Sequence, residues 1–280
     1  MDAFDRKQPG KRMPRFKRKG CGDSFRFPQS VKIEDNWVFL PKIGWTRMCL
    51  SREIEGEIMN ATISLRGRHW FVSIQTVQEI PDPVHSSSTA VGLDRGVANL
   101  ATLSDGIVFE GAKPLKKLLR KLARQQRELS RKTKFSNNWK KQRDRISRLH
   151  IKIADARRDA IHKATTAISK NHAVVCLEDL RTRNMTRSAR GSVDSLGSNV
   201  RQKAGLNRSI LDQGWFEFQR QLEYKQQWGG GQIIYVPARN TSRTCSACGH
   251  TEHADMNAAK NILAAGLAAT ACGGRPKGSH

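Results

Sequence analysis

The sequence predicts an α/β protein with a basic helical insertion and a small β-rich region at its N-terminal end. Three observations lead to this prediction. Short runs of β-forming residues separated by turn residues fill residues 24–80. Two later apolar runs of the kind found in buried strands end in acids, Asp94 and Glu178, and the 113–163 stretch between them has helical periodicity. A third acid, Asp255, opens a short alanine-rich helix.

Composition points to a polyanionic partner. The chain has 280 residues, with 50 Lys+Arg against 25 Asp+Glu, a net charge of +25 and a pI near 10.5. Such an excess favours binding to a phosphate backbone, with an affinity that falls as salt rises. The alternative is a solvated basic surface of the ribosomal-protein type.

Several other classes are not supported. No uncharged run approaches the roughly 20 residues of a membrane helix, and the basic N-terminal residues lack the apolar segment of a signal peptide. Of six cysteines, only Cys245 and Cys248 are closely paired, which favours a reducing compartment over a disulfide scaffold. We therefore expect no membrane partner and a cytoplasmic location.

Residues 1–88 are predicted to form a basic arm, a partial β-barrel and a linker. Residues 1–20 hold eight Lys/Arg, and the Pro/Ser-rich stretch 81–88 marks the boundary. The strands are expected at Ser24–Pro28, Trp37–Leu40, Ile58–Leu65 and His69–Val77. Four tryptophans are expected in the core: Trp37, Trp45, Trp70 and Trp215.

Residues 89–268 are predicted to form the main domain, followed by a disordered tail at 269–280. Thr89–Asp94 opens an antiparallel meander, because Asp105-Gly106 between apolar runs is a hairpin signal. A later buried strand, 173–177, delivers Glu178. The strand at 232–236 and a helix at 255–265 complete the domain.

The helical insertion, residues 112–170, is strongly positive on its exposed faces. Residues 113–163 hold 19 Lys/Arg and 4 Asp/Glu. Two interpretations stay open: solvated helix faces, or a helical hairpin that lies along a nucleic-acid duplex. The predicted contacts are Lys116, Lys117, Arg120, Lys121, Arg124, Arg127, Lys140, Lys141, Arg143 and Arg243. Trp139 is a further candidate for contact with nucleic acid.

The three acids suggest phosphodiester hydrolysis. A carboxylate that ends a buried strand is costly unless a cation meets it. Mg²⁺ prefers oxygen ligands, and two such ions can activate a water and stabilise the leaving oxyanion. A first strand, a later parallel strand and a final helix, each with one acid, is the arrangement of the RNase H-like fold. Asp94, Glu178 and Asp255 are thus the predicted catalytic Mg²⁺ ligands, and for Glu178 the alternative is a cap on the following turn.

The local motifs resemble the TnpB (OrfB) family of insertion-sequence proteins. Asp94 with its flanking glycines, Glu178-Asp179-Leu180, the Asp255-Met256-Asn257-Ala258-Ala259 segment and the Cys245-to-His250 knuckle carry the resemblance, which covers about residues 10 to 270. It implies a RuvC-type site, a guide RNA from the transposon end and RNA-guided cleavage of DNA. It also implies a prokaryotic protein that is associated with the nucleoid.

The chain departs from that family in two places. Residues 1–80 resemble only the later strands of the wedge barrel, without the helical recognition domain. The zinc element, 239–254, resembles two knuckles collapsed into one. Structural Zn²⁺ needs four ligands, and Cys245 and Cys248 supply two, so zinc binding and a metal-free loop both stay open.

The sequence supports a nuclease first and two alternatives. The second is a catalytically inactive, nucleic-acid-binding remnant or regulator, and the third is a DDE-type transposase. The intact acids favour the nuclease, while the two shortened regions favour the remnant. The guide RNA, the target-adjacent motif and the oligomeric state are not determined by the sequence.

Overall fold

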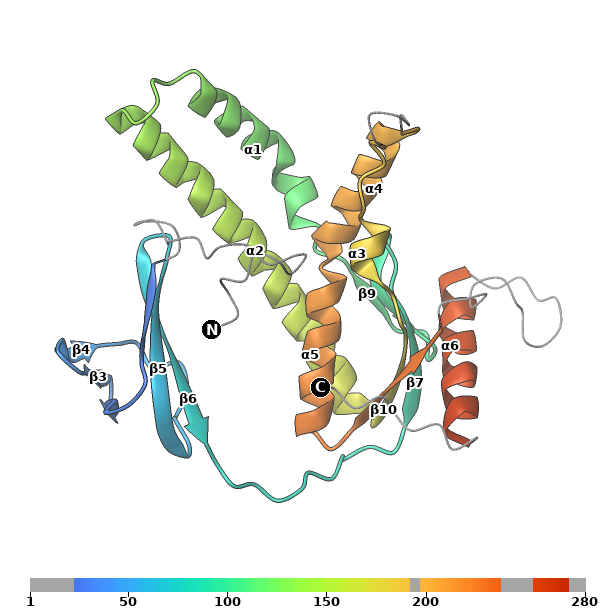
Figure 1. Ribbon diagram of the computed structural model, residues 1–280. Coiled ribbons are helices and arrows are strands. Elements are labelled where there is room, and N and C mark those ends of the chain that lie inside the picture. Colours follow the sequence, from blue (N-terminus) through green and yellow to red (C-terminus); the bar gives the residue numbers. More distant parts are fainter. Residues whose placement is uncertain (1–22, 192–196, 238–253, 272–280) are drawn as a thin grey trace, which may run out of the picture. The chain divides into compact units, whose positions relative to one another are not determined.

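The computed structural model describes residues 23–191, 197–237 and 254–271 (Figure 1). The chain divides into two compact units, Met1–Ile80 and Pro81–His280. The predicted limits of the domains stay predictions, although the division falls at the start of the 81–88 linker. In the described part of the chain, no helix is long and apolar enough to cross a membrane.

The first unit contains two small antiparallel sheets. One has the order β1-β5-β6 and the other β2-β3-β4. The strands are β1 (Ser24–Phe27), β2 (Lys32–Glu34), β3 (Trp37–Leu40), β4 (Gly44–Arg47), β5 (Glu57–Arg66) and β6 (His69–Val77). Gly67 makes the β5–β6 turn with a φ of 68°, a conformation that glycine adopts without a steric cost. Val38, Leu40, Ala61 and Ile63 form the core of this unit with Val31.

The expectation that three tryptophans of this unit lie in the core is wrong. Trp37, Trp45 and Trp70 are 47%, 43% and 56% exposed. Successive side chains of a strand point to opposite faces, so the core takes Val38 and Leu40 and leaves Trp37 outside. In a unit of two small sheets, one face of each strand packs in the core and the other face stays in contact with solvent. Trp215, in the second unit, is 4% exposed, as expected.

The second unit is built on a mixed five-stranded sheet of order β11-β10-β7-β8-β9. Its strands are β7 (Ala90–Asp94), β8 (Asn99–Leu103), β9 (Val108–Glu110), β10 (Val174–Glu178) and β11 (Gln232–Val236). β7, β8 and β9 are antiparallel neighbours, whereas β10 is parallel to both β7 and β11. Gly106 closes the β8–β9 turn with a φ of 98°, and its N–H donates to the carbonyl of Leu103.

Helices cover both faces of this sheet, so the unit is a three-layer α/β structure (Figure 1). The helices are α1 (Pro114–Ser130), α2 (Asn137–Asn171), α3 (Thr182–Met185), α4 (Val200–Gln213), α5 (Trp215–Trp228) and α6 (Ala254–Ala271). α2 and α5 pack on one face through Ile161, Ile168, Phe218 and Leu222. α6 packs on the other, where Ile262 meets Cys176, Ile234 and Val236.

α1 and α2 form a long helical hairpin whose seam follows the predicted periodicity. Leu122, Ile146, Leu149 and Ile153 are buried between the two helices. Ser136 caps α2 by accepting the N–H of Trp139 at 3.2 Å. Leu119 also belongs to the apolar spacing of α1, but its side chain is 38% exposed. Its place is beside α4, where it lines a cavity.

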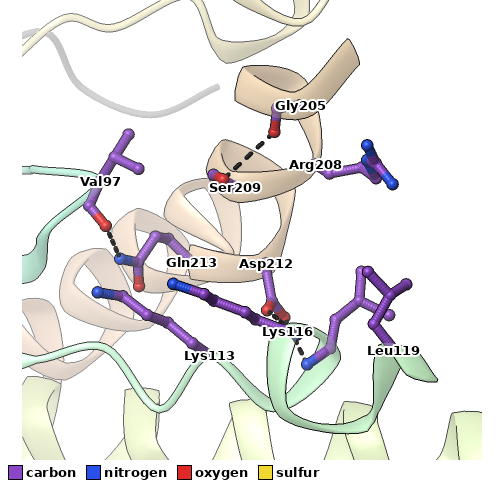
Figure 2. Close-up of a pocket in the computed structure, with 10 residues that line it drawn as sticks. Val97, Lys113, Lys116, Leu119, Gly205, Arg208, Ser209, Asp212 and Gln213 are labelled. Atoms are coloured by element: carbon purple, nitrogen blue, oxygen red, sulfur yellow. Dashed lines mark hydrogen bonds between the residues drawn. The ribbon is translucent and has the colours of Figure 1, made fainter. Parts of the chain in front are cut away.

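Asp212 of α4 joins three helices, and Figure 2 shows its side chain beside Lys116 of α1. Its carboxylate accepts the main-chain N–H groups of Leu115 and Lys116 at 3.2 and 3.1 Å and thereby caps α1 from another element. Arg157 of α2 donates to the same carboxylate at 2.8 Å and to the Asp212 carbonyl at 2.9 Å. A cavity of about 270 Å³ lies beside this junction, with Lys113, Lys116 and Arg208 among the residues that line it.

Candidate functional site

Asp94 and Glu178 lie at the carboxyl ends of two neighbouring strands inside the sheet. β7 and β10 are parallel, and Leu93 is in register with Leu177. The next residue on each strand is the acid, so the two acids occupy neighbouring positions at the carboxyl ends of β7 and β10. The carboxyl ends of parallel strands are where α/β sheets bind their ligands.

Both acids face the helix that carries the third. Gly92 and Cys176 precede the acids by two residues and therefore share their face of the sheet. α6 packs against both positions, because a Cβ on Gly92 would lie 2.0 Å from the carbonyl oxygen of Ala259 and one on Gly266 would lie 2.3 Å from the Cys176 sulfur. Asp255 stands in the first turn of this helix.

The carboxylates interact electrostatically. Burial, then Glu178, then Asp255 raise the pKa of Asp94 from 3.8 to about 6, while Arg95 opposes the shift. The charges of Glu178 and Asp255 thus act on Asp94 through electrostatic repulsion. Nevertheless, in the described part of the chain no three His, Cys, Asp or Glu side chains form a ready group of metal ligands. The three acids as a metal site therefore stay a prediction.

The oxygen ligands of these three carboxylates fit a hard divalent cation. Carboxylate oxygens are the ligands that Mg²⁺ prefers, and a cation would relieve the repulsion that raises the pKa of Asp94. Glu178 is 9% exposed and Asp94 is partly buried, so water alone compensates their charges poorly. The chemistry of these residues is thus compatible with Mg²⁺ held by Asp94, Glu178 and Asp255.

The raised pKa predicts how metal-free stability depends on pH. The folded state binds the Asp94 proton more tightly than the unfolded chain, so stability is lost as pH rises from about 4 through about 6. Asp94→Asn is expected to stabilise the protein near neutral pH by roughly 1 kcal/mol after discounting for partial exposure, or about 2–4 °C in Tm.

Thermal melts in EDTA across this pH range measure the effect. The control is Asp82→Asn, which removes an exposed acid of the 81–88 linker and should retain the loss of stability between pH 4 and 6. An identical pH dependence in wild type and Asp94→Asn would contradict the coupling of the three carboxylates.

The comparisons with known proteins now identify the family. Residues 72–189 match the OrfB_IS605 family, described as "Probable transposase", and residues 215–262 match the "Cas12f1-like, TNB domain". A protein of Escherichia coli K12 named "Putative RNA-guided DNA endonuclease InsQ" is 53% identical over 94% of this chain and 72% of its own length. The chain belongs to the TnpB (OrfB) family.

Other TnpB relatives are longer than this chain. It is 35% identical to a protein of Streptomyces pristinaespiralis over 74% of this chain and 52% of that protein. The corresponding values for a Mycobacterium tuberculosis H37Rv protein are 30%, 86% and 55%. Both carry the same kind of name as the Escherichia coli protein. The chain thus spans about half the length of these two relatives.

One solved structure, "Cryo-EM structure of the Cas12f1-sgRNA-target DNA complex", is also similar. The likeness covers 89% of this chain and 68% of that one, at 18% identity and a TM-score of 0.39.

Arg95 is a site residue that sequence reasoning missed. It follows Asp94, so its side chain lies on the opposite face of the sheet, where it is 5% exposed. Its guanidinium donates to the main-chain carbonyl of Glu178 at 2.5 Å and to Gln219 of α5 at 3.1 Å. Burial lowers the pKa of Arg95, and the acids around it oppose that shift. One arginine among 50 basic residues carries no signal in the sequence.

Gln219 extends this support to the neighbouring strand. Its amide donates to Glu223 and to the Tyr235 hydroxyl, each at 3.1 Å, and that hydroxyl donates to Glu223. Burial and the bond to Glu223 raise the pKa of Tyr235, so the phenol stays neutral. The network ties α5 and β11 to the ends of β7 and β10, and it thereby holds the backbone that carries Asp94 and Glu178.

The predicted nucleic-acid contacts of α1 and α2 lie on the surface. All nine of these Lys and Arg side chains are exposed. Arg124 pairs with Glu128 at 3.1 Å, an exposed pair of small energetic value. Exposure fits either a solvated face or a binding face, so nucleic-acid contact stays a prediction. Arg243, Cys245 and Cys248 lie outside the described residues.

Proposed function

We propose that this chain is an RNA-guided, Mg²⁺-dependent DNA endonuclease of the TnpB type. The observation that carries the proposal is the register of Leu93 with Leu177, which makes Asp94 and Glu178 neighbours on the face covered by the helix of Asp255. We propose further that the mixed sheet is an RNase H-like (RuvC) core. Support comes from its parallel β7 and β10, its antiparallel β8 and its terminal helix.

The roles of the chain's own residues follow from their positions. Asp94, Glu178 and Asp255 would hold Mg²⁺, which supplies charge stabilisation for hydrolysis of a phosphodiester. Arg95 and Gln219 fix the strand ends from the other face of the sheet. The exposed Lys and Arg side chains of α1 and α2 would bind the backbones of guide RNA and DNA. Such a reaction belongs in the bacterial cytoplasm, at the nucleoid.

Two further assignments rest on the motifs. The first unit is proposed as a partial wedge-like domain, because its described residues form two small sheets. Cys245 and Cys248 are proposed as two ligands of a shortened zinc element. Measurement of bound zinc by mass spectrometry in the wild type and in Cys245→Ser tests the second assignment.

A second candidate function is a nucleic-acid-binding remnant that does not cleave. One observation favours it: the described residues contain no ready group of metal ligands. In this case the basic helices would retain their role and the carboxylates would have none.

A cleavage assay separates these functions. Purified protein is incubated with its cognate RNA, a target plasmid and Mg²⁺, beside Asp94→Ala. Cleavage by the wild type that is lost in Asp94→Ala is the expected result. Binding without cleavage would support the remnant instead. Joining of strands at a new site would point to a transposase.

A further inference from the structure

An aromatic pair lies where α1 connects to α2, formed by the exposed Phe135 and the half-buried Trp139. Phe135 precedes the α2 cap and is 66% exposed. Its ring centroid lies 5.5 Å from that of Trp139, and the rings are inclined by 57°. The connection lies at the end of the hairpin remote from the sheet (Figure 1). From Trp139 to Ile161, where α2 meets the sheet core, the helix rises about 33 Å.

Phe135 has a backbone conformation that its side chain disfavours. Its φ is 68°, in the left-handed region that glycine and asparagine enter most easily. The hydrophobic seam of the hairpin consists of leucines and isoleucines and does not include Phe135. A strained residue with an exposed ring contributes little to packing, and strain of this kind concentrates at functional sites.

Cations surround the two rings. The Lys134 Nζ lies 5.4 Å from the centroid of Phe135, and the Arg143 guanidinium carbon lies 5.4 Å from the centroid of Trp139. Residues 131–143 hold six Lys/Arg and no Asp/Glu. An exposed ring among positive charges suits a ligand that has both a π-face and a negative charge.

We propose that this aromatic tip, formed by Phe135 and Trp139 with Lys134 and Arg143, stacks on an unpaired nucleobase. Phe135 offers the ring face, and the cations bind the flanking phosphates, as in proteins that bind single strands. Charge decides the ligand class, since six cations without an acid favour a polyanion over an apolar protein surface. The inference rests on the proposed function, which supplies two sources of such bases: guide RNA and displaced DNA.

Fluorescence anisotropy with labelled single-stranded RNA and DNA oligonucleotides tests the tip. Phe135→Ala is expected to weaken binding by roughly 5- to 150-fold, the value of one base–aromatic stack. The matched control is Phe216→Ala, which removes a ring that is 72% exposed on α5 and should not change the affinity. If Phe135→Ala loses affinity for RNA alone, the base belongs to the guide RNA. If it loses affinity for DNA alone, the base belongs to the displaced DNA strand.

Phe135→Gly separates binding from folding. Glycine adopts a φ of 68° without strain but makes the unfolded chain more flexible, so this variant should melt within about 4 °C of the wild type and still lose affinity. A larger fall in melting temperature would show that the ring is a structural contact and would overturn the inference. Wild-type affinity in both Phe135 variants would also overturn it and leave the proposed function standing. A wild type that binds neither oligonucleotide would instead contradict the proposed function itself.

Discussion

Replacement of Glu178 by Gln is expected to reduce DNA cleavage by roughly 10²- to 10³-fold while nucleic-acid binding is unchanged. Glu178 is buried, and its charge contributes to the raised pKa of Asp94. The amide keeps the shape of the side chain and removes the charge that would hold Mg²⁺. Loss of several kcal/mol of charge stabilisation corresponds to the stated factor.

Two measurements make this result specific. Calorimetric titration with Mg²⁺ should show weaker binding to Glu178→Gln, and anisotropy with labelled RNA should show an unchanged affinity. Asp179→Asn is the matched control, because Asp179 is the next residue and is exposed. Cleavage by Glu178→Gln within twofold of the wild type would remove Glu178 from the proposed site.

Replacement of Gly92 by Ala is expected to destabilise the protein by about 3 kcal/mol, near the upper end of typical overpacking costs. The new Cβ would lie 2.0 Å from the Ala259 carbonyl oxygen and 2.7 Å from the Leu263 nitrogen. Both are main-chain atoms of α6, so no side chain can rotate away and the helix must move from the sheet. Because Asp255 is in the first turn of that helix, cleavage should fall as well.

Gly205→Ala is the control for the Gly92 variant. Gly205 lies in α4, and a Cβ there meets nothing within 4 Å. Alanine has the higher helix propensity, so this variant should be more stable by up to about 1 kcal/mol. Urea denaturation of both variants measures the difference. Equal stability of Gly92→Ala and the wild type would show that α6 does not press on β7.

Local patterns were sufficient to predict most elements of the second unit. The Asp105-Gly106 turn indicated the β8–β9 hairpin, and the leucine and isoleucine spacing indicated the α1–α2 seam. These signals succeed because turn geometry and helical periodicity depend on residues close together in the chain. The same kind of pattern placed an acid at the end of β7 and another at the end of β10.

Contacts between distant segments were beyond reach of those patterns. Asp212 caps α1 across 96 positions of sequence, and Arg95 reaches Glu178 across 83. No pattern in the residues next to Asp212 or Arg95 indicates which distant segment each of them contacts. The exposed Trp37, Trp45 and Trp70 show the same limit, because hydrophobic character alone does not reveal which face of a small sheet another layer covers.

The sequence by itself determined a strongly basic chain of the TnpB family, with three acids at the ends of its predicted elements. Only the tertiary structure decided that two of them are neighbours, because the register of parallel strands depends on their packing between α2, α5 and α6. It also decided that Arg95 supports them from behind and that Phe135 stands exposed in a strained conformation. These contacts and exposures depend on which distant segments of the chain pack together, and the residue types of one segment do not reveal its packing partner.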